Sequence, residues 1–532
     1  MSPDTQYDYI IVGAGSAGCV LANRLSASGR HRVLLLEAGG SDRNPLLRIP
    51  ILGAFLGVRN PAYDWNYRTL PDPSRNNRKD FWPRGRVLGG SSAINGMIYV
   101  RGDRDDYNHW AQMGNTGWAF DDVEPYFRRI ENHEFDGAEY GQDGPVRVRP
   151  THGAHPLSHM FVKANEAKGI PHNPHYNGAT QEGTCLLSLT NSGRVRYSSA
   201  QAYLQPARRR PNLTIRTHCL AHEIAFEGAK AVGVHFSYHG QKTLAGASKE
   251  VILAGGSINS PQLLMLSGIG PGAHLQELGL AVRQDLPVGD NLHEHPALMM
   301  QAATTTASYN TQLGPLNLIR HGYDWAVHGR GMLSTVIFQA LSFIKTDPAL
   351  SHPDIQLHFA PCGIMSTDTS IGMMTENSYS IQANVNRSRS RGTLRLADTA
   401  PTTPPAIQAN MLGDQYDVET LIAGTKIMFD LCDGEVLGPI TTNTIIPRDR
   451  PQTDDDWEQL VRGYTIPTYH PVGTCKMGTD QSAVVTPELK VKGIDNLRVV
   501  DASIMPHVIS GNTNAAAMMI GEKGAHMVLR EG

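Results

Sequence analysis

A strand, a glycine-rich turn and a helix open the chain, and this arrangement constrains the fold more than any other segment. Tyr7 to Gly18 reads YDYIIVGAGSAG, an apolar run of strand length that stops at glycines, and Arg32 to Leu36 (RVLLL) supplies a second apolar strand. Small and apolar residues at helical spacing, Cys19 to Leu25, lie between the two. A strand–helix–strand unit of about 30 residues predicts a buried parallel sheet.

Gly13, Gly15 and Gly18 give the turn the spacing GxGxxG, directly between strand and helix. The first glycine permits a tight turn, the second lets the backbone approach a pyrophosphate, and the third allows close helix packing. Glu37 ends the second strand, 19 residues beyond Gly18, where a carboxylate binds ribose hydroxyls. The segment predicts a dinucleotide site, but the motif alone does not distinguish NAD from FAD.

Composition excludes several other classes of protein. The 532 residues hold 47 Lys and Arg against 50 Asp and Glu, a net charge of -3, which disfavours nucleic-acid binding. No apolar run reaches the roughly 18 residues that span a bilayer, and Met1 to Gln6 lacks the pattern of a signal peptide. The six cysteines are scattered without a CxxC pair, which predicts no structural metal and a reducing, cytoplasmic location.

Apolar segments further along the chain predict two separate sheets. Three strand patterns, Asn212 to Thr217, Ala231 to Phe236 and Glu250 to Ala254, are interpreted as an antiparallel meander that returns to a central strand. Two alternating segments, Ile355 to Phe359 and Tyr379 to Val385, suit an antiparallel sheet in a second domain. The length itself suggests about three domain-sized units or two large ones.

Four motifs in fixed order resemble a known enzyme family. Besides the N-terminal turn, they are Gly85 to Gly102 (GRVLGGSSAINGMIYVRG), Gly256 to Gly270 (GSINSPQLLMLSGIG) and Val499 to Lys523 (VVDASIMPHVISGNTNAAAMMIGEK). Together they resemble the glucose-methanol-choline (GMC) flavoprotein oxidoreductases over nearly the whole chain. Within that family, the chain is most similar to choline-dehydrogenase-like bacterial alcohol dehydrogenases that use FAD.

The resemblance implies a mixed α/β fold, with a Rossmann-like FAD-binding domain and a substrate domain built on an antiparallel sheet covered by helices. It also implies that the FAD-binding domain is discontinuous. We expect residues 1–155, 205–298 and 465–532 to form it, and residues 156–204 and 299–464 to form the substrate domain.

The same resemblance implies the residues that contact FAD. Asn95 to Ile98 match the segment along the flavin ring, and Ala221 is placed where a main-chain group meets the adenine. Ile94 stands where some choline oxidases carry a histidine bonded to the flavin, so we expect noncovalent FAD. The expected contacts are Gly13, Gly15, Ser16, Gly18, Glu37, Ala38, Trp65, Val87, Gly89, Gly90, Ser91, Asn95, Gly96, Met97, Ile98, Ala221, Asp501, Ala502, Asn512 and Thr513.

Two further segments imply the catalytic groups. Tyr469 to Cys475 (YHPVGTC) resembles the active-site segment of the family, in which His470 is the general base while a hydride passes to flavin N5. In SGNTNA, Asn514 is expected to donate a hydrogen bond to the alcohol oxygen, with Asn512 as the near alternative. The two histidines of DNLHEHP (Asp290 to Pro296) lack a third metal ligand and are interpreted as structural.

The resemblance predicts oxidation of a primary alcohol to an aldehyde, with a quinone or another non-oxygen acceptor. An oxidase that forms hydrogen peroxide and a hydroxynitrile-lyase-like enzyme that retains FAD without redox turnover are the alternatives. The sequence leaves open the alcohol, the oligomeric state and peripheral contact with the inner membrane. No amphipathic anchor for such contact is recognised in the sequence.

Overall fold

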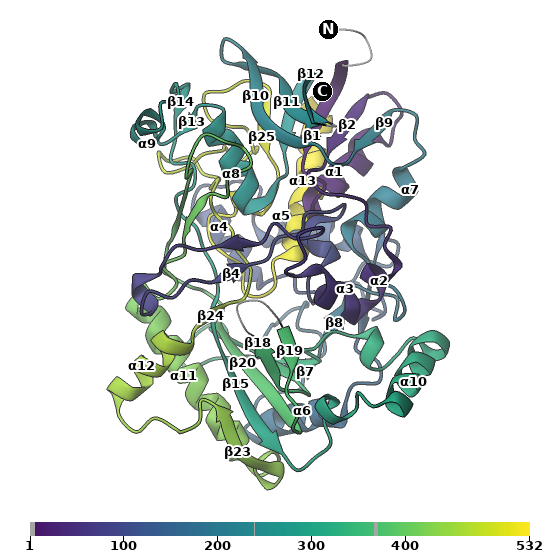
Figure 1. Ribbon diagram of the computed structural model, residues 1–532, viewed down its shortest axis with the longest axis vertical. Coiled ribbons are helices and arrows are strands. Elements are labelled where there is room, and N and C mark those ends of the chain that lie inside the picture. Colours follow the sequence, from purple (N-terminus) through teal and green to yellow (C-terminus); the bar gives the residue numbers. More distant parts are fainter. Residues whose placement is uncertain (1–5, 239, 367–370, 532) are drawn as a thin grey trace.

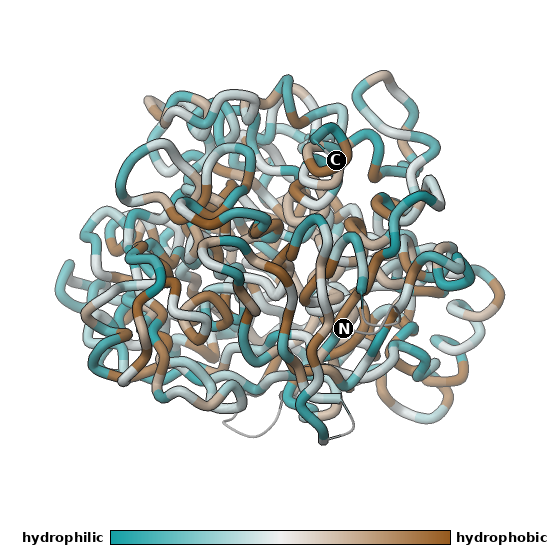
Figure 2. The backbone as a smooth tube through the Cα atoms, turned by 90° about the horizontal axis from the view of Figure 1, so that it is seen from above, coloured by the Kyte–Doolittle hydropathy of each residue, from teal (hydrophilic) through white to brown (hydrophobic). Residues whose placement is uncertain are grey.

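The computed structural model describes residues 6–238, 240–366 and 371–531. Residues 1–5, most of the segment judged above to lack a signal peptide, therefore lie outside the described part. The molecule is elongated, with one large sheet near each end, and both termini lie at the same end (Figure 1). Apolar segments run through the interior, while hydrophilic segments gather at the outer loops (Figure 2).

The first sheet contains the predicted strand–helix–strand unit at its centre. Strand β1 (Gln6–Val12) lies between β2 (Val33–Leu36) and β12 (Gln241–Leu253), parallel to both. All four residues of β2 are buried, as expected of a strand covered on both faces. Strand β25 (Leu497–Val499) pairs with β12 in parallel, so segments from both ends of the chain meet here.

The predicted meander is correct in part. Strands β10 (Leu220–Glu227), β11 (Lys230–Tyr238) and β12 form consecutive antiparallel pairs at one edge of the first sheet. Strand β9 (Leu213–Arg216), the first of the three expected strands, does not belong to the meander and pairs in parallel with β2 at the opposite edge. The alternating pattern of β9 fits a parallel edge strand as well as a strand of the meander. Periodicity alone therefore did not distinguish a place beside β2 from a place in the meander.

Helices at both ends of the chain cover this sheet together. Helix α1 (Ser16–Ser26) follows the glycine turn and packs against α13 (Asn514–Glu531), which also packs on α5 (Phe120–Ile130). Helix α8 (Gly256–Leu266) follows β12 directly. The other helices around this sheet are α2 (Pro45–Arg48), α3 (Pro50–Gly57), α4 (Arg104–Gln112), α7 (Gln205–Ala207) and α9 (Gly272–Glu277).

The second sheet is antiparallel, and its central strands follow the alternating segments of the sequence. Its order is β23-β15-β20-β17-β16-β7, with β24 paired to β15. The predicted strands at 355–359 and 379–385 are confirmed as neighbours, β17 and β20. The bounds are β7 (Gly183–Leu186), β15 (Pro296–Thr304), β16 (Ala340–Ile344), β17 (Ile355–Ala360), β20 (Ser378–Val385), β23 (Thr441–Ile446) and β24 (Ile466–Pro467).

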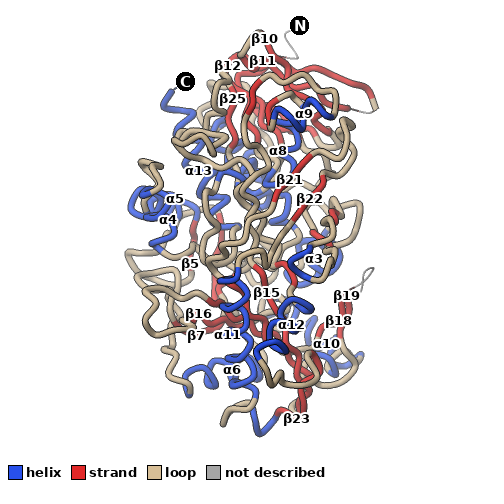
Figure 3. The backbone as a smooth tube through the Cα atoms, turned by 90° about the vertical axis from the view of Figure 1, so that its left-hand side faces the viewer, coloured by secondary structure: helices blue, strands red, loops and turns tan. Residues whose placement is uncertain are grey.

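The two faces of the second sheet differ in polarity. Helices α6 (Pro156–Ala167) and α11 (Gln415–Cys432) pack on one face, where Leu357 and Ile381 join their apolar core. Helix α12 (Asp454–Tyr464) packs beside α11 (Figure 3). Because side chains alternate along a strand, residues such as His358 and Gln382 face the other way, toward the middle of the molecule.

Several short elements lie outside the two large sheets. They are β3 (Tyr67–Arg68), β4 (Phe81–Trp82), β5 (Glu131–His133), β6 (Val146–Pro150), β8 (Ser188–Leu189), β13 (Ile269–Gly270), β14 (Gln284–Asp285), β18 (Ile364–Ser366), β19 (Ile371–Met373), β21 (Thr393–Arg395), β22 (Ala406–Gln408) and α10 (Pro315–Tyr323). Within the described residues, no helix is both long enough and apolar enough to cross a membrane.

We retain the two-domain division as a proposal, with differences at its borders. Strand β24 and the first residues of β15 belong to the second sheet, although they lie in segments assigned to the FAD-binding domain. Leu394 and Ile407, on β21 and β22, pack in the core of the first sheet rather than the second.

Candidate active site

A cavity of about 550 Å³ lies between the two sheets. Its wall includes Glu37 and Ala38 at the end of β2, and it extends to His470 and Asn512. Residues from the first sheet, the glycine loops and the polar face of the second sheet all line it. A long cavity of this kind suits an extended dinucleotide with a substrate beside it.

The glycines of the N-terminal turn are required by close backbone packing. Gly13 has a φ of 102°, and a Cβ there would lie 2.5 Å from the carbonyl oxygen of Ala254. A Cβ on Gly18 would lie 1.9 Å from the carbonyl oxygen of Gly13. Gly90 has a φ of 53°, and a Cβ on Gly90 would lie 2.7 Å from the Cα of Gly15. These contacts leave backbone exposed to the cavity, as a pyrophosphate site needs.

Glu37 directly follows β2 and lies beside the glycine turn, as the sequence pattern predicted. Its carboxylate accepts hydrogen bonds from the backbone N–H groups of Ala14 (2.9 Å) and Gly39 (2.7 Å). Burial raises the pKa of Glu37 to about 7, and the two N–H groups oppose this shift. A carboxylate fixed in this way beside the glycine turn is oriented to accept ribose hydroxyls.

Asp501 joins two segments at the cavity wall. Its carboxylate accepts from the Gly256 N–H (2.9 Å), the Ser260 hydroxyl (2.6 Å) and the Ser503 N–H (2.8 Å). Burial raises the pKa of Asp501. The side chain therefore holds the start of α8 against the segment that follows β25.

Most of the expected cofactor residues line the cavity. Gly18, Val87 and Gly89 do not: Gly18 packs under the turn, Val87 is fully buried beside Gly40, and the Gly89 N–H donates to Ala14. Those three positions support the cavity wall instead of forming it. The lining members are Gly13, Gly15, Ser16, Glu37, Ala38, Trp65, Gly90, Ser91, Asn95, Gly96, Met97, Ile98, Ala221, Asp501, Ala502, Asn512 and Thr513.

His470 is held at the cavity wall by contacts on both ring nitrogens. Its Nδ1 lies 3.0 Å from Nδ1 of His295 and 3.1 Å from the hydroxyl oxygen of Thr468. Its Nε2 lies 3.1 Å from the side-chain nitrogen of Asn512. Burial, followed by the positive potential of neighbouring groups including Arg84, keeps the pKa of His470 well below its ordinary range. The imidazole is therefore neutral at neutral pH.

The hydrogen bonds of Thr468 indicate which ring nitrogen carries the proton. The Thr468 hydroxyl donates to Glu294 (3.0 Å) or to the His295 carbonyl (3.2 Å), so its oxygen accepts from His470. We assign the proton of His470 to Nδ1 on this basis. The lone pair on Nε2 then lies at the cavity wall and accepts a hydrogen bond from the side-chain NH₂ group of Asn512.

Glu294 and His295 were missed as parts of this site. Glu294 accepts from the backbone N–H of His470 and from that of His295, and burial raises the pKa of Glu294 to about 7. The motif DNLHEHP was visible in the sequence, but its two histidines were interpreted as structural groups. His295 instead contacts His470, and His293 bonds to Asn291 away from it.

The turn of Tyr469 also fixes the position of His470. Tyr469 has a φ of 66°, which is uncommon for a residue other than glycine. The Arg84 guanidinium donates a hydrogen bond to the Tyr469 carbonyl. A backbone constrained directly before His470 limits the directions in which the imidazole can point.

The structure corrects the expected partner of His470. Asn514 was expected to lie opposite the base, but its side-chain oxygen accepts a hydrogen bond from Ser16 (2.7 Å) on α1. Asn512 occupies the position beside Nε2. Asn514 begins helix α13 and faces the glycine turn, whereas Asn512 lies in the preceding loop and faces the second sheet.

The second sheet contributes the part of the cavity beyond His470. Met299, Gln382 and His358 lie side by side on three neighbouring strands and all face the cavity. Apolar side chains complete this part of the wall, among them Ile337 and Phe338. Burial lowers the pKa of His358 to about 4, so this imidazole is also neutral.

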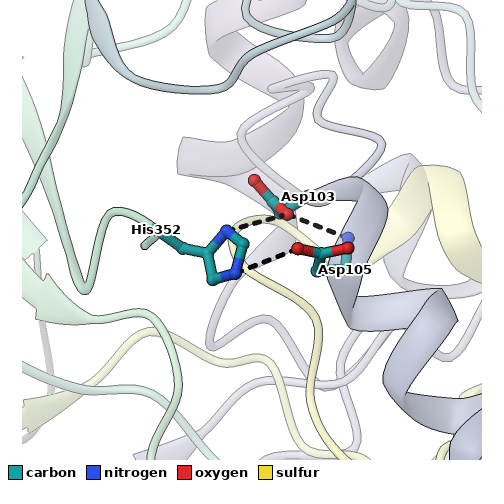
Figure 4. Close-up of side chains that lie close together, drawn as sticks. All are labelled: Asp103, Asp105 and His352. Carbon is teal, nitrogen blue, oxygen red and sulfur yellow. Dashed lines mark hydrogen bonds and ion pairs between the residues drawn. The ribbon is translucent and has the colours of Figure 1, made fainter. Parts of the chain in front are cut away.

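A separate group of acidic residues and histidine lies outside the cavity. His352 approaches Asp105 (3.0 Å) and Asp103 (3.6 Å) (Figure 4). The Asp103 side chain caps helix α4, and Arg387 lies 3.4 Å from it. Helix capping and ion pairing account for these contacts.

Comparison with known proteins agrees with the architecture of this site. GMC oxidoreductase family models match residues 7–297 and 388–521. The chain belongs to the GMC oxidoreductase family. It is 40% identical to the oxygen-dependent choline dehydrogenase of Sinorhizobium fredii (98% of this chain, 96% of the relative). It is also 40% identical to the alcohol dehydrogenase [acceptor] of Pseudomonas putida (99% and 96%).

Solved GMC-type structures share the fold over nearly the full length. Pyridoxine 4-oxidase from Mesorbium loti superposes with a TM-score of 0.87 at 28% identity, covering 98% of each chain. An FAD-dependent oxidoreductase from Chaetomium thermophilum gives 0.89 at 26% identity, covering 99% of each chain. GMC oxidoreductases are FAD-binding flavoproteins that act on CH–OH groups, and the cavity described above fits FAD.

Proposed function

We propose that the protein oxidises an uncharged primary alcohol to the aldehyde and passes the electrons to a quinone or another non-oxygen acceptor. The observation that carries this proposal is the neutral imidazole of His470, whose Nε2 faces the cavity beside Asn512. A neutral imidazole in a closed site is suited to remove a hydroxyl proton.

The alcohol oxygen is proposed to replace the direct contact between Asn512 and Nε2 of His470 and to bind to both side chains. The Asn512 amide donates a hydrogen bond to this oxygen without competing for its proton, and Nε2 of His470 accepts that proton. When bound, FAD supplies the two-electron acceptor for the hydride that leaves the carbinol carbon. Helix α13 begins beside the cavity at Asn514. The positive end of its dipole would stabilise the negative charge of the reduced flavin.

The residues that would hold FAD support a noncovalent complex. Ile94 is apolar, lines the cavity and packs against Gly57, so it offers no atom for a bond to the flavin. Glu37 and the glycine loops would bind the adenosine and pyrophosphate groups. Acid precipitation of the protein is expected to release all of the flavin into the supernatant, and retention in the pellet would contradict noncovalent binding.

The wall beyond His470 supports a substrate with an apolar chain. Met299, Ile337, Phe338 and Ile364 form much of that wall. Each CH₂ group that such a wall buries contributes about 0.8 kcal/mol. Linear aliphatic and aryl alcohols therefore fit this site better than a small cationic alcohol such as choline.

Anaerobic flavin bleaching tests the proposal. The FAD-loaded protein is mixed without oxygen with 1-butanol, 1-octanol, benzyl alcohol or choline, and the flavin absorbance is followed. We expect the uncharged alcohols to bleach the flavin faster than choline does. A flavin that no alcohol bleaches would overturn the proposal and favour a lyase.

A second measurement identifies the acceptor. The reduced protein is mixed with a soluble quinone or with air-saturated buffer, and reoxidation is timed. Faster reoxidation by the quinone supports a dehydrogenase. Reoxidation by oxygen at an equal or greater rate, with stoichiometric hydrogen peroxide, would show an oxidase.

A further inference from the structure

Helix α10 and the turn that follows it expose an apolar face to solvent. Leu316 is 83% exposed, Ile319 70%, Tyr323 58% and Val327 48%. Their spacing of three, four and four residues places them along one side of α10 and its continuation Asp324–His328. We call Leu316, Ile319, Tyr323 and Val327 the outer apolar face.

The helix is oriented opposite to an ordinary surface helix. Surface helices normally turn their apolar stripe to the core and their polar side to water. Here Asn317 and His321 are less exposed than the outer apolar face, and the His321 ring packs against Tyr309. None of the residues of α10 is buried. Exposing so many large apolar groups is unfavourable in water, which indicates that another apolar phase covers them.

Basic side chains surround this face. Arg320 and Arg330 both lie near Asp324, at 4.0 Å and 3.2 Å, and their side chains remain 80% and 54% exposed. Arg194 donates hydrogen bonds to the carbonyls of Ala326 and Val327. Three arginines against one aspartate give the region a local positive charge. That charge is complementary to anionic lipid headgroups.

The outer apolar face is linked to the substrate part of the cavity by apolar packing. Helix α10 packs on the short turn Met332–Ser334, and this turn packs on α3. The same apolar cluster contains Ile337, Phe338 and Ile364, which line the cavity. Other exposed apolar residues are Leu56 on α3 and Met365 on β18, each next in sequence to a member of this cluster, and Leu313 and Leu318 beside the face in sequence.

We propose that α10 lies in the surface of an anionic lipid bilayer and anchors the protein there. The helix stands at the edge of the molecule (Figure 1), as insertion into a bilayer surface requires. Its exposed aromatic residue Tyr323 suits the boundary between headgroups and acyl chains. In the sequence, peripheral membrane contact was left open and no amphipathic anchor was recognised. In combination with the proposed function, the anchor would bring the cavity close to the phase in which apolar alcohols and quinones dissolve.

Vesicle sedimentation of the FAD-loaded protein tests this anchor. The lipid probes are vesicles of phosphatidylcholine alone and vesicles that also contain about 30 mol% phosphatidylglycerol, which gives them an anionic surface. We expect binding to the anionic vesicles, weakened by high salt because exposed charges are screened. Failure of the protein to bind either vesicle would overturn the proposal.

Two variants separate the anchor from non-specific adhesion of exposed apolar groups. The triple variant Leu316→Ser, Ile319→Ser and Val327→Ser is expected to lower binding to anionic vesicles by roughly 10-fold or more. The matched control, Leu70→Ser with Leu529→Ser, removes exposed leucines elsewhere and should bind like the parent. Wild-type binding by the triple variant would contradict the proposal.

Two further measurements distinguish a lipid anchor from misfolding of the variant and from self-association. Dye reduction with a soluble alcohol should be unchanged in the triple variant, which shows that it is folded and active whether or not the alcohol proposed above is the natural substrate. Gel filtration without lipid tests for self-association. If the triple variant converts a dimer to a monomer and the parent does not bind vesicles, the face is an interface between two copies, and the proposal is wrong.

Discussion

Both carboxylate oxygens of Glu294 lie 2.9 Å from the backbone nitrogen of His470. The contact joins the segment before β15 to the active-site turn, 176 residues further along the chain. Glu294 does not line the cavity, so its effect on the reaction must pass through the position of His470 and through the Thr468 hydroxyl, which donates to it.

The variant Glu294→Gln should therefore lower kcat more than it raises KM. The glutamine keeps one acceptor oxygen but turns an NH₂ group toward a backbone donor, which displaces His470. We expect kcat to fall roughly 10-fold or more, because small misplacements of a reacting group are costly. Steady-state kinetics at full FAD loading measures this. The control Glu488→Gln, at an exposed position, should match the parent.

Asn512 and Asn514 should give different defects when changed to alanine. Asn512→Ala removes the proposed donor to the alcohol oxygen and should slow flavin reduction roughly 100-fold at unchanged FAD content. Asn514→Ala removes the bond to Ser16 and should weaken FAD binding with a nearly normal reduction rate. Stopped-flow reduction and FAD titration distinguish the two. The reverse pattern would restore Asn514 as the partner of His470.

The pH dependence of kcat/KM should report the low pKa of His470. The base works only when neutral, and its pKa in the folded protein lies well below 6.5. Protonation of His470 should therefore lower kcat/KM only as the pH falls below about 6.5, the ordinary histidine value. The same acid limb should appear in Glu294→Gln. If the limb vanished in that variant, it would belong to Glu294.

The raised pKa of Glu294 predicts a pH-dependent difference in stability. In the unfolded chain this carboxyl ionises near 4.5, whereas in the folded protein it keeps its proton up to about 7. Unfolding therefore releases a proton between these values, and this contribution to stability is lost as the pH rises through that window. The Tm of the parent minus that of Glu294→Gln should decrease from about pH 4.5 to about pH 7.5. A constant difference would contradict the shift.

A methyl group on Gly18 should disrupt the FAD site. The Cβ of Gly18→Ala would lie 1.9 Å from a backbone oxygen, so the turn must move. We expect destabilisation of about 1–3 kcal/mol and loss of most of the FAD. Gly463→Ala, in helix α12 with no atom within 4 Å of its new Cβ, should instead be neutral or stabilising. Thermal unfolding and the flavin absorbance of the purified proteins measure both.

The sequence predicted the parts of the site that depend on local patterns. The glycine turn and Glu37 are set by a strand, a turn and a helix that are contiguous in the chain, and the structure places them as that pattern requires. The role of His470 rests on its motif and remains a proposal.

The contacts that the sequence did not reveal depend on distant segments or on backbone direction. Glu294 meets His470 only because β15 and β24 pair in the second sheet. Asn512 and Asn514 are two residues apart, and Gly511 between Ser510 and Asn512 has a φ of 119°, which sets the direction of the loop. Neither a strand pairing nor a glycine dihedral angle can be read from residue spacing.

The order of strands in the first sheet has a consequence for biosynthesis. Strand β1 is made first, but its neighbour β12 and the helix α13 that packs on α1 follow hundreds of residues later. At an elongation rate of about 5–20 residues per second, the edge of β1 that pairs with β12 stays unpaired for roughly 10–50 s. The FAD cavity is therefore completed only after translation ends. Until then the N-terminal half exposes unpaired strand edges and apolar surface, which binding of a chaperone or of FAD would cover.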